Sequence, residues 1–261
     1  MHTYTKATKY TDLETIYAQC GGPGGLKLAE FMAEKMQLQA GKHLLDVGTS
    51  RGYQSCFLAK EYGVFVVGID PWADRDGIST HIDHLMQNAQ VWGVPELVLG
   101  VQVGVPDTRF ADNTFDYVYS TTTLEMIRGI EGEEAYRKCL AEIYRVLKPG
   151  GVFGLGEPMH LDIEIPADLV LPAAQENETW ADCFATIKET EAACQSVGFE
   201  IVEADYAPDA RLWWEEYAKY DEGCQEDDAE RRAIQEDGGR WISFGCVVAK
   251  KPAASRDETS R

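Results

Sequence analysis

Short apolar runs alternate with helical patterns along most of this chain, and the alternation constrains the fold more than any other feature. Strands are predicted at KHLLDVG, FVVGID, LVLGVQV, FDYVYS, GVFGLGEP, FEIVEADYA and WISFGCVVAKK, and helices over 26–36, 54–61, 81–93, 133–147 and 180–197. Alternation of this kind builds a parallel sheet with helices on both faces. No clean crossover helix separates the last two strands, so the seventh strand is predicted to run antiparallel.

The predicted fold is therefore α/β, with a Rossmann-like seven-stranded, mostly parallel sheet and an antiparallel last strand. A chain of 261 residues can bury one good core and is short for two full domains. Residues 1–40 are expected to cap the sheet domain of 41–250, and 251–261 to fray. An insert at about 208–240 is longer than the turn needed there, and we expect it to form a lid.

Charge and cysteine usage narrow the class of partner. The formal net charge is −20, which repels phosphate backbones and argues against a nucleic-acid partner. A neutral or cationic small molecule suits this charge, although acidity for solubility alone explains it as well. Seven scattered cysteines without a CxxC pair argue against disulfides and against a metal site. No segment approaches the ~20 apolar residues of a membrane helix, so we expect a soluble, cytoplasmic protein of open oligomeric state.

The stretch LLDVGTSRGYQS predicts a strand, a glycine-bearing turn and a helix, which is how α/β folds hold a nucleotide-like ligand. Gly48 and Gly52 lie in this turn, where a missing Cβ lets the backbone approach a ligand. Asp46 precedes the turn, and its carboxylate would repel a pyrophosphate but suits an ammonium group and a sulfonium. Asp70 ends the second strand, where a carboxylate can accept both hydroxyls of a ribose. Capping of the following helix or loop is the structural alternative for both acids.

Four motifs resemble those of class I S-adenosylmethionine-dependent methyltransferases, most closely the small-molecule branch called type 11. They are LLDVGTSRG, VVGID, FADNTFDYVYSTTTLEMI and RVLKPGGVF, and they cover roughly 44–153. The resemblance implies S-adenosylmethionine as the cofactor. It also implies that Asp46, Gly48, Thr49 and Gly52 form the loop beside the methionine part of the cofactor, and that Asp70 binds the ribose. Pro71 and Trp72 would then flank the adenine. Ser120 and Thr121 would line the cofactor after the fourth strand.

Two positions depart from the pattern of that family. Ser50 replaces a glycine of the loop, which the fold tolerates if the φ angle of Ser50 stays negative. The family often has an acid after the third strand to meet the adenine amine. Asp107 is the predicted stand-in, displaced by one or two positions. Trp72 also has a plain alternative, which is packing on the sheet edge.

The substrate should lie over the carboxyl ends of the strands, beneath the N-terminal region and the lid. Tyr17, Trp213, Trp214 and Tyr217 are the predicted substrate residues, because aromatic faces beside carboxylates attract cations. The alternative is that the lid aromatics only pack the lid onto the body.

Glu125, Glu157 and His160 follow the ends of strands four and five and are the predicted proton-handling residues. For the two glutamates the alternative is helix capping or a salt bridge with Arg128 or Arg145. His81 and His84 lack a further ligand cluster, so we predict that they lie on the outer surface of their helix rather than at a metal.

These observations predict methyl transfer to a small-molecule acceptor, with an amine nitrogen slightly favoured over oxygen. Two other enzyme classes stay open. One is an NAD(P)-dependent oxidoreductase on a similar sheet, although no YxxxK pair supports it. The other is a thiophilic, arsenite-type methyltransferase that uses Cys20 with Cys183, Cys194 or Cys224. A non-catalytic regulator whose substrate face is plugged by 208–239 is a further alternative.

Overall fold

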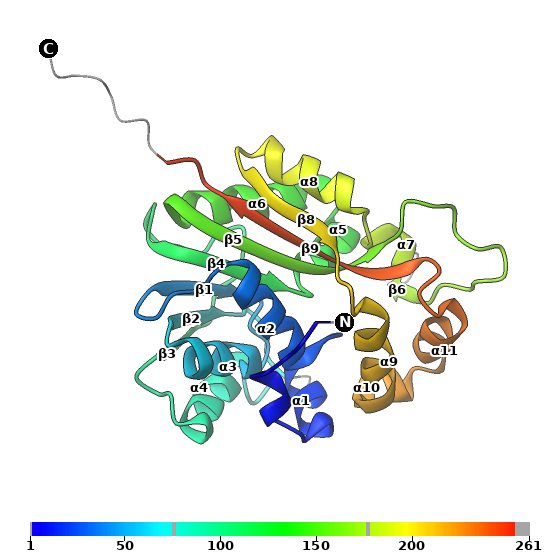
Figure 1. Ribbon diagram of the computed structural model, residues 1–261, viewed down its shortest axis with the longest axis horizontal. Helices are drawn as coiled ribbons and strands as arrows, with labels where there is room; N and C mark the ends of the chain where they lie inside the picture. Colours follow the sequence, from blue (N-terminus) through cyan, green and yellow to red (C-terminus); the bar gives the residue numbers. More distant parts are fainter. Residues whose placement is uncertain (1, 75–76, 176–177, 254–261) are drawn as a thin grey trace, which may run out of the picture.

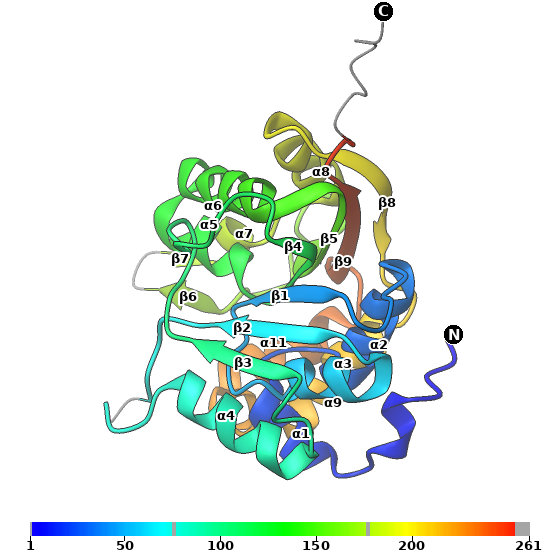
Figure 2. The same cartoon turned by 90° about the vertical axis from the view of Figure 1, so that its left-hand side faces the viewer.

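The computed structural model describes residues 2–74, 77–175 and 178–253, and its centre is a seven-stranded sheet of order β3-β2-β1-β4-β5-β9-β8 (Figures 1 and 2). Strand β9 pairs antiparallel with both β5 and β8, and β1 to β5 pair parallel with one another. The predicted fold class is confirmed, with the last strand inserted between the fifth and the sixth. The strands are β1 His43–Val47, β2 Phe65–Ile69, β3 Val98–Val101, β4 Phe115–Thr121, β5 Leu147–His160, β8 Glu200–Tyr206 and β9 Ile242–Lys250.

Each face of the sheet buries its own apolar cluster. Helices α2 (Gly25–Lys35), α3 (Tyr53–Tyr62) and α4 (His81–Trp92) cover one face. Helices α6 (Glu133–Val146) and α8 (Ile187–Ser196) cover the other. This two-layer covering is the arrangement that strand–helix alternation requires.

Local capping explains where several helices begin and end. Thr80 and Asp83 form a reciprocal capping box at the start of α4, and Gly93 ends that helix in the left-handed region. The single helix predicted over 180–197 is two helices, α7 (Trp180–Cys183) and α8. Thr186 caps α8 with Glu189 as its partner, so the chain restarts a helix there.

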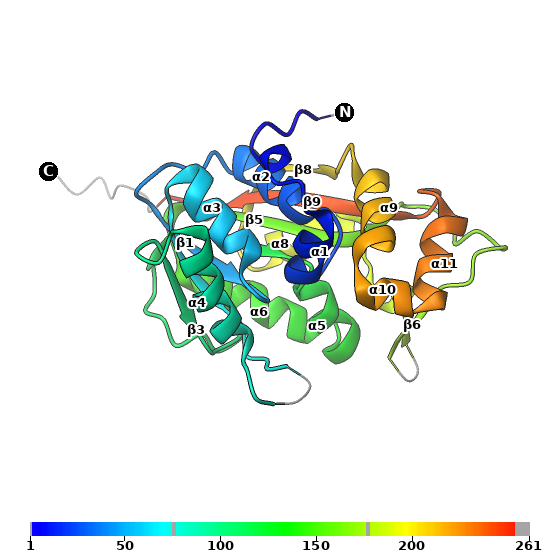
Figure 3. The same cartoon turned by 90° about the horizontal axis from the view of Figure 1, so that it is seen from below.

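A third layer covers one end of the sheet and comes from segments far apart in the sequence. It contains α1 (Leu13–Cys20) from the N-terminal region and α9 (Ala210–Tyr220), α10 (Glu222–Glu226) and α11 (Asp228–Asp237) from the predicted lid. Helix α1 packs between α3 and α9 (Figure 3). The lid helices and the segment around α7 share a separate apolar cluster that includes Trp180, Trp214 and Trp241.

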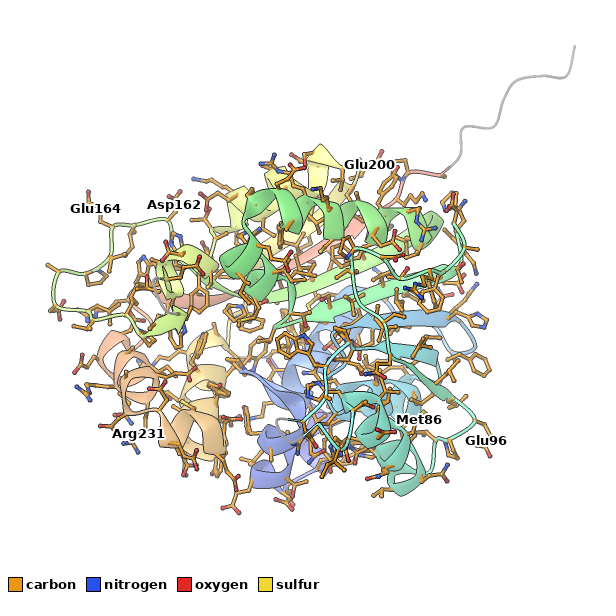
Figure 4. The ribbon with its side chains drawn as sticks, turned by 180° about the vertical axis from the view of Figure 1, so that it is seen from behind. Met86, Glu96, Asp162, Glu164, Glu200 and Arg231 are labelled. Carbon is orange, nitrogen blue, oxygen red and sulfur yellow. The ribbon has the colours of Figure 1, made fainter. Side chains whose placement is uncertain are left out.

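The loop after β5 and the lid lie at the end of the molecule opposite to α4. In Figure 4, Asp162 and Glu164 of that loop and Arg231 of α11 mark one end, and Met86 and Glu96 mark the other. The remaining elements are the 3₁₀ turn η1 (Ala7–Lys9), α5 (Leu124–Glu131), β6 (Ala173–Gln175) and β7 (Glu178–Thr179).

The expected tail begins at Lys251, whose Nζ donates to the carbonyls of Tyr144 and Leu147, both at 2.8 Å. Residues 254–261 of that expected tail lie outside the described residues. None of the helices within the described residues is long and apolar enough to cross a bilayer.

Candidate functional site

A cleft of about 290 Å³ opens at the carboxyl ends of β1, β2 and β4. Its floor comes from the turns after β1 and β2, and one wall comes from α5. The lining residues are Gly21, Val47, Gly48, Ser50, Ile69, Asp70, Pro71, Trp72, His81, Gly104, Val105, Thr122, Thr123, Met126, Ile127, Ile130 and Glu131. This is the edge at which open α/β sheets bind ligands.

The two predicted loop glycines are required by packing as well as by the turn. Both have positive φ angles, 76° each. A Cβ on Gly48 would lie 2.1 Å from Thr123 Oγ1, and one on Gly52 would lie 2.0 Å from Leu85 Cδ1. Only Gly48 also lines the cleft. The space left by each missing Cβ is therefore taken by a side chain of the protein itself.

Ser50 adopts a φ of +50°, so the expectation that its φ stays negative is wrong. The left-handed conformation costs an L-residue about 1–2 kcal/mol. It also turns the backbone N–H of Ser50 towards Asp70 Oδ2, at 3.0 Å. The hydrogen bond fastens the first turn to the end of the second strand, and it offsets part of the conformational cost.

Asp70 is buried, 6% exposed, and is one of the residues that line the cleft. Besides Ser50, the backbone N–H of Trp72 donates to its Oδ1 at 3.0 Å. A carboxylate has about four acceptor positions, so these two bonds leave room for about two further donors. Such a group can accept a pair of hydroxyls.

Asp46 lies beneath the loop rather than in the cleft lining. Ser55 Oγ donates to Asp46 Oδ2 at 2.5 Å, and Thr49 Oγ1 lies 2.8 Å from Ser55 Oγ. Burial raises the pKa of Asp46 to about 6, and the two hydroxyl groups oppose that rise. Asp46 and Thr49 thus hold the loop from below and face Ser55.

The two residues predicted to line the cleft after β4 are still part of that strand, and the next two residues line the cleft instead. Ser120 Oγ donates to the Val47 carbonyl at 3.0 Å, and Thr121 Oγ1 donates to Gln54 Oε1 at 2.8 Å, so both hydroxyls are used inside the fold. Thr122 and Thr123 line the cleft in their place. The strand extends to Thr121, which moves the opening past the predicted pair.

Of the three residues predicted to lie beside the adenine, two line the cleft and one does not. Pro71 and Trp72 line the cleft, and Trp72 is 60% exposed. The side chain of Asp107 is exposed and lies 3.6 Å from Arg109, outside the residues that line the cleft. Gly104 and Val105 form the wall on that side.

Glu125 and Glu157 form a buried acidic pair behind α5 instead of lining the cleft. Tyr136 donates its hydroxyl to Glu157 Oε2 at 3.1 Å, and Arg128 Nη1 lies 3.8 Å from the same oxygen. Arg128 thus realises the salt-bridge alternative, whereas Arg145 pairs with Glu142 and Asp112. Within the described part of the chain, Glu125 Oε2 and Glu157 Oε1 have no hydrogen-bond partner.

Burial dominates the protonation of this pair. It raises the pKa of Glu125 well above the usual range, and the nearby charge of Glu157 raises it further. Burial also raises the pKa of Glu157 to about 7, against the opposing effects of Arg128 and Tyr136. Burial therefore favours the protonated form of Glu125, in which the carboxyl group can donate a hydrogen bond.

His160 and the lid aromatics belong to packed clusters. The His160 ring stacks on Trp241 with ring centres 4.7 Å apart. Trp213 is fully buried between Phe31 and Phe244, and Trp214 donates its Nε1 to the Ser243 carbonyl. These contacts are the packing alternative for the two tryptophans, and a contact with substrate stays a prediction.

The two predicted tyrosines join the N-terminal region to the lid. Tyr17 donates its hydroxyl to Glu216 Oε2 at 3.0 Å, and its ring lies near those of Tyr217 and Tyr220. Lys27 Nζ lies 2.5 Å from the other oxygen of Glu216. The carboxylate of Glu216 thus fastens α9 to α1 and α2.

Comparison with known proteins gives the family context for this cleft. Residues 45–155 match a family model described as a methyltransferase domain. A sterol 24-C-methyltransferase from Yarrowia lipolytica is 33% identical over 127 residues, which are 49% of this chain and 30% of that protein. The chain spans less than half the length of the curated relatives that it matches.

Two solved structures share the fold. The [4+2]-cyclase SpnF superposes with a TM-score of 0.69 at 20% identity, over 88% of this chain and 82% of that one. A geranyl diphosphate methyltransferase in complex with S-adenosylmethionine superposes with a TM-score of 0.68 at 17% identity, over 87% and 85% of the two chains. The predicted resemblance to class I S-adenosylmethionine-dependent methyltransferases is confirmed.

The cleft lies almost entirely within the segment that matches the methyltransferase-domain model. Every lining residue except Gly21 falls within 45–155. Sequence reasoning placed the segment 121–132 on the ligand-facing side of the sheet but did not name Thr122, Thr123 or the α5 wall as site residues, and it placed His81 elsewhere. The TTTLEMI motif could have indicated Thr122, Thr123 and the α5 wall, because it continues directly from β4. His81 had none, because its place depends on how the segment after β2 folds back.

Proposed function

We propose that this chain is a methyltransferase that binds S-adenosylmethionine in the cleft and transfers its methyl group to a small molecule. The observation that carries the proposal is the joining of the Gly48 turn to Asp70 through the Ser50 N–H, inside the matched domain. Asp70 would accept the ribose hydroxyls, with Pro71 and Trp72 beside the adenine. Gly48 and Ser50 would face the methionine part, with Asp46, Thr49 and Gly52 holding the turn from below.

Methyl transfer from a sulfonium requires few catalytic side chains. S-adenosylmethionine supplies a methyl carbon that is already activated by the sulfonium. The acceptor lone pair bonds to that carbon while the carbon–sulfur bond breaks, and its electron pair stays on sulfur. Alignment and exclusion of water are the main requirements. The loop Gly21–Gly22 closes against Ser50 and Thr122, which supports such shielding.

An amine acceptor is the proposed substrate class, slightly ahead of an alcohol. Glu131 is a carboxylate in the cleft lining, next to the apolar wall of Met126, Ile127 and Ile130. The net charge of −20 favours a cationic or neutral acceptor. A proton released by the acceptor would pass to water or to the carboxylate of Glu157 behind α5.

The alternative functions have less support. The family match favours a methyl donor over NAD(P). Among the described residues, no group of three or more His, Cys, Asp or Glu side chains could hold a metal ion, so the cysteines give no thiophilic site support. The lining of the cleft contains no residue from 208–239, which gives a plugged regulator no support either.

Calorimetric titration with S-adenosylmethionine and with NADH tests the proposal. We expect binding of the methyl donor and none of NADH. Asp70→Ala should weaken binding about 10-fold or more, because hydrogen bonds to a charged group are lost. Asp74→Ala is the matched control, since Asp74 lies in the same loop but pairs with His84 and Arg51 outside the cleft. Binding of NADH alone would overturn the proposal, and release of S-adenosylhomocysteine with amine, alcohol and isoprenoid panels would identify the acceptor.

A further inference from the structure

His81 lies in the lining of the cleft, whereas the sequence predicted the outer surface of its helix. It occupies the first position of α4 and lines the cleft beside Asp70. Its Nδ1 is 3.1 Å from Asp70 Oδ1, and its backbone N–H donates to the Trp72 carbonyl at 3.1 Å. The segment after β2 therefore folds back and brings the ring to the ligand-facing side of Asp70.

In the part of the chain that the structure describes, the ring nitrogen of His81 that faces Asp70 has no hydrogen-bond partner. Within the described residues, His81 Nδ1 is buried and makes no hydrogen bond of acceptable geometry, despite its distance from the carboxylate. A lone pair on Nδ1 would be repelled by the carboxylate, so Nδ1 is expected to carry the proton. An unmade hydrogen bond at a buried donor costs about 1–3 kcal/mol. A donor left in this state on the wall of a cleft indicates that a ligand supplies its partner.

The donor and the acceptor stand side by side. The backbone donors of Ser50 and Trp72 use about two of the roughly four acceptor positions of Asp70. A hydroxyl group is both a donor and an acceptor. It can therefore donate to Asp70 and accept from His81 Nδ1–H at the same time.

We propose that His81 is a specificity-determining residue that holds, together with Asp70, one hydroxyl of a vicinal diol such as ribose. The inference rests on the proposed function, because the diol is that of the cofactor. In this arrangement His81 contacts the ligand directly, and His81 and Asp70 recognise the hydroxyl together. The deoxyribose that lacks the shared hydroxyl would leave His81 Nδ1–H without an acceptor and would remove one donor from Asp70.

His84 provides a matched control one helical turn away. It lies on the same helix and also pairs with an aspartate, with Nε2 2.7 Å from Asp74 Oδ2. Neither His84 nor Asp74 is among the residues that line the cleft. A loss caused only by disturbing the first turn of α4 should appear for both histidines.

The test is calorimetric binding of S-adenosylhomocysteine and of its 2′-deoxy and 3′-deoxy analogues to the full chain. His81→Phe should weaken S-adenosylhomocysteine about 10-fold, whereas His81→Asn, which keeps a donor near the Nδ1 position, should stay within about 3-fold. His84→Phe should change affinity less than about 2-fold. The decisive readout is coupling, because the deoxy analogue that lacks the shared hydroxyl should lose affinity in the wild type but little further in His81→Phe.

Two results would overturn the inference. One is unchanged affinity in His81→Phe, and the other is a full deoxy penalty in that variant. If His81→Phe does not fold, His81→Ala takes its place as the variant without a donor, and His81→Asn stays the variant that keeps one. Absence of S-adenosylhomocysteine binding by the wild type would overturn the proposed function itself, and the inference with it, and is thus a different result.

Discussion

The cofactor cleft and the lid differ in how far along the chain their contacts reach. In the cleft, the Ser50 N–H and Asp70 are 20 residues apart and lie in neighbouring turns of the sheet. At the lid, Tyr17 and Glu216 are 199 residues apart, and Tyr4 and Asp209 are 205 apart. The cleft is a product of one strand–helix unit repeated, whereas the lid exists only once both ends of the chain have come together.

The two regions also use their aromatic residues differently. Trp72 at the cleft is 60% exposed, and Trp213 in the lid is fully buried. An exposed ring beside a cleft is available to a ligand, whereas a buried ring stabilises the fold. Substitutions of the two should therefore separate binding from stability.

The largest effect is expected for Trp213→Ala. Removing a fully buried tryptophan leaves a cavity and should cost about 3–5 kcal/mol of unfolding free energy, measured by denaturant titration. Trp72→Ala should leave stability nearly unchanged and weaken binding of S-adenosylmethionine. Equal stability losses for the two variants would contradict the contrast between lid and cleft.

The buried pair behind α5 should make stability depend on pH. Since the pKa of Glu157 is raised from 4.5 to about 7, the folded state binds more protons than the unfolded state between these values, and stability falls as pH rises. The loss should be on the order of 3 kcal/mol by pH 8. Glu157→Gln should flatten this part of the pH profile of unfolding.

The exposed Glu203→Gln is the control for that profile, because its partner Lys35 lies at the surface. It should leave the slope as it is in the wild type. If the stability of the wild type instead rises between pH 4.5 and 7, and Glu157→Gln removes that rise, Glu157 is charged throughout this range.

Gly48→Ala tests the turn of the cleft. The new Cβ would lie 2.1 Å from Thr123 Oγ1 in addition to the cost of its positive φ. We expect a loss of about 2–4 kcal/mol from overpacking and backbone strain together. Gly93→Ala shares a positive φ but has open space, so it should lose only about 1 kcal/mol when the thermal unfolding of both variants is measured. Equal losses would mean that Thr123 moves away freely.

The smallest effect is expected for Ser50→Gly. Glycine adopts a φ of +50° without strain and keeps the N–H that donates to Asp70. Because glycine also loses more chain entropy on folding, the net gain should be about 0.5–1 kcal/mol, or a rise of roughly 1–4 °C in Tm. A lower Tm would show that the serine side chain, which lies close to Gly21, contributes more than the strain costs.

The sequence by itself determined the sheet, its helices and the position of the cleft. The period-2 and period-3.6 patterns, the Gly48–Gly52 turn and the acid at the end of β2 are all local, and neighbouring units place them together without help from distant residues. Gly48 and Asp70 were placed at the cleft for that reason, whereas Pro71 and Trp72 were placed there by the resemblance to the methyltransferase family.

Only the tertiary structure decided what each side chain faces. It turned Asp46 towards Ser55, buried Glu125 and Glu157 behind α5, and left Asp107 outside the cleft. It also brought His81 to Asp70 and Trp213 into the core. Spacing along the chain sets which face of an element a residue occupies, but burial, charge and hydrogen-bond partners come from the elements packed against that face. Those partners can lie 9 residues away, as Ser55 does from Asp46, or 199 residues away, as Glu216 does from Tyr17.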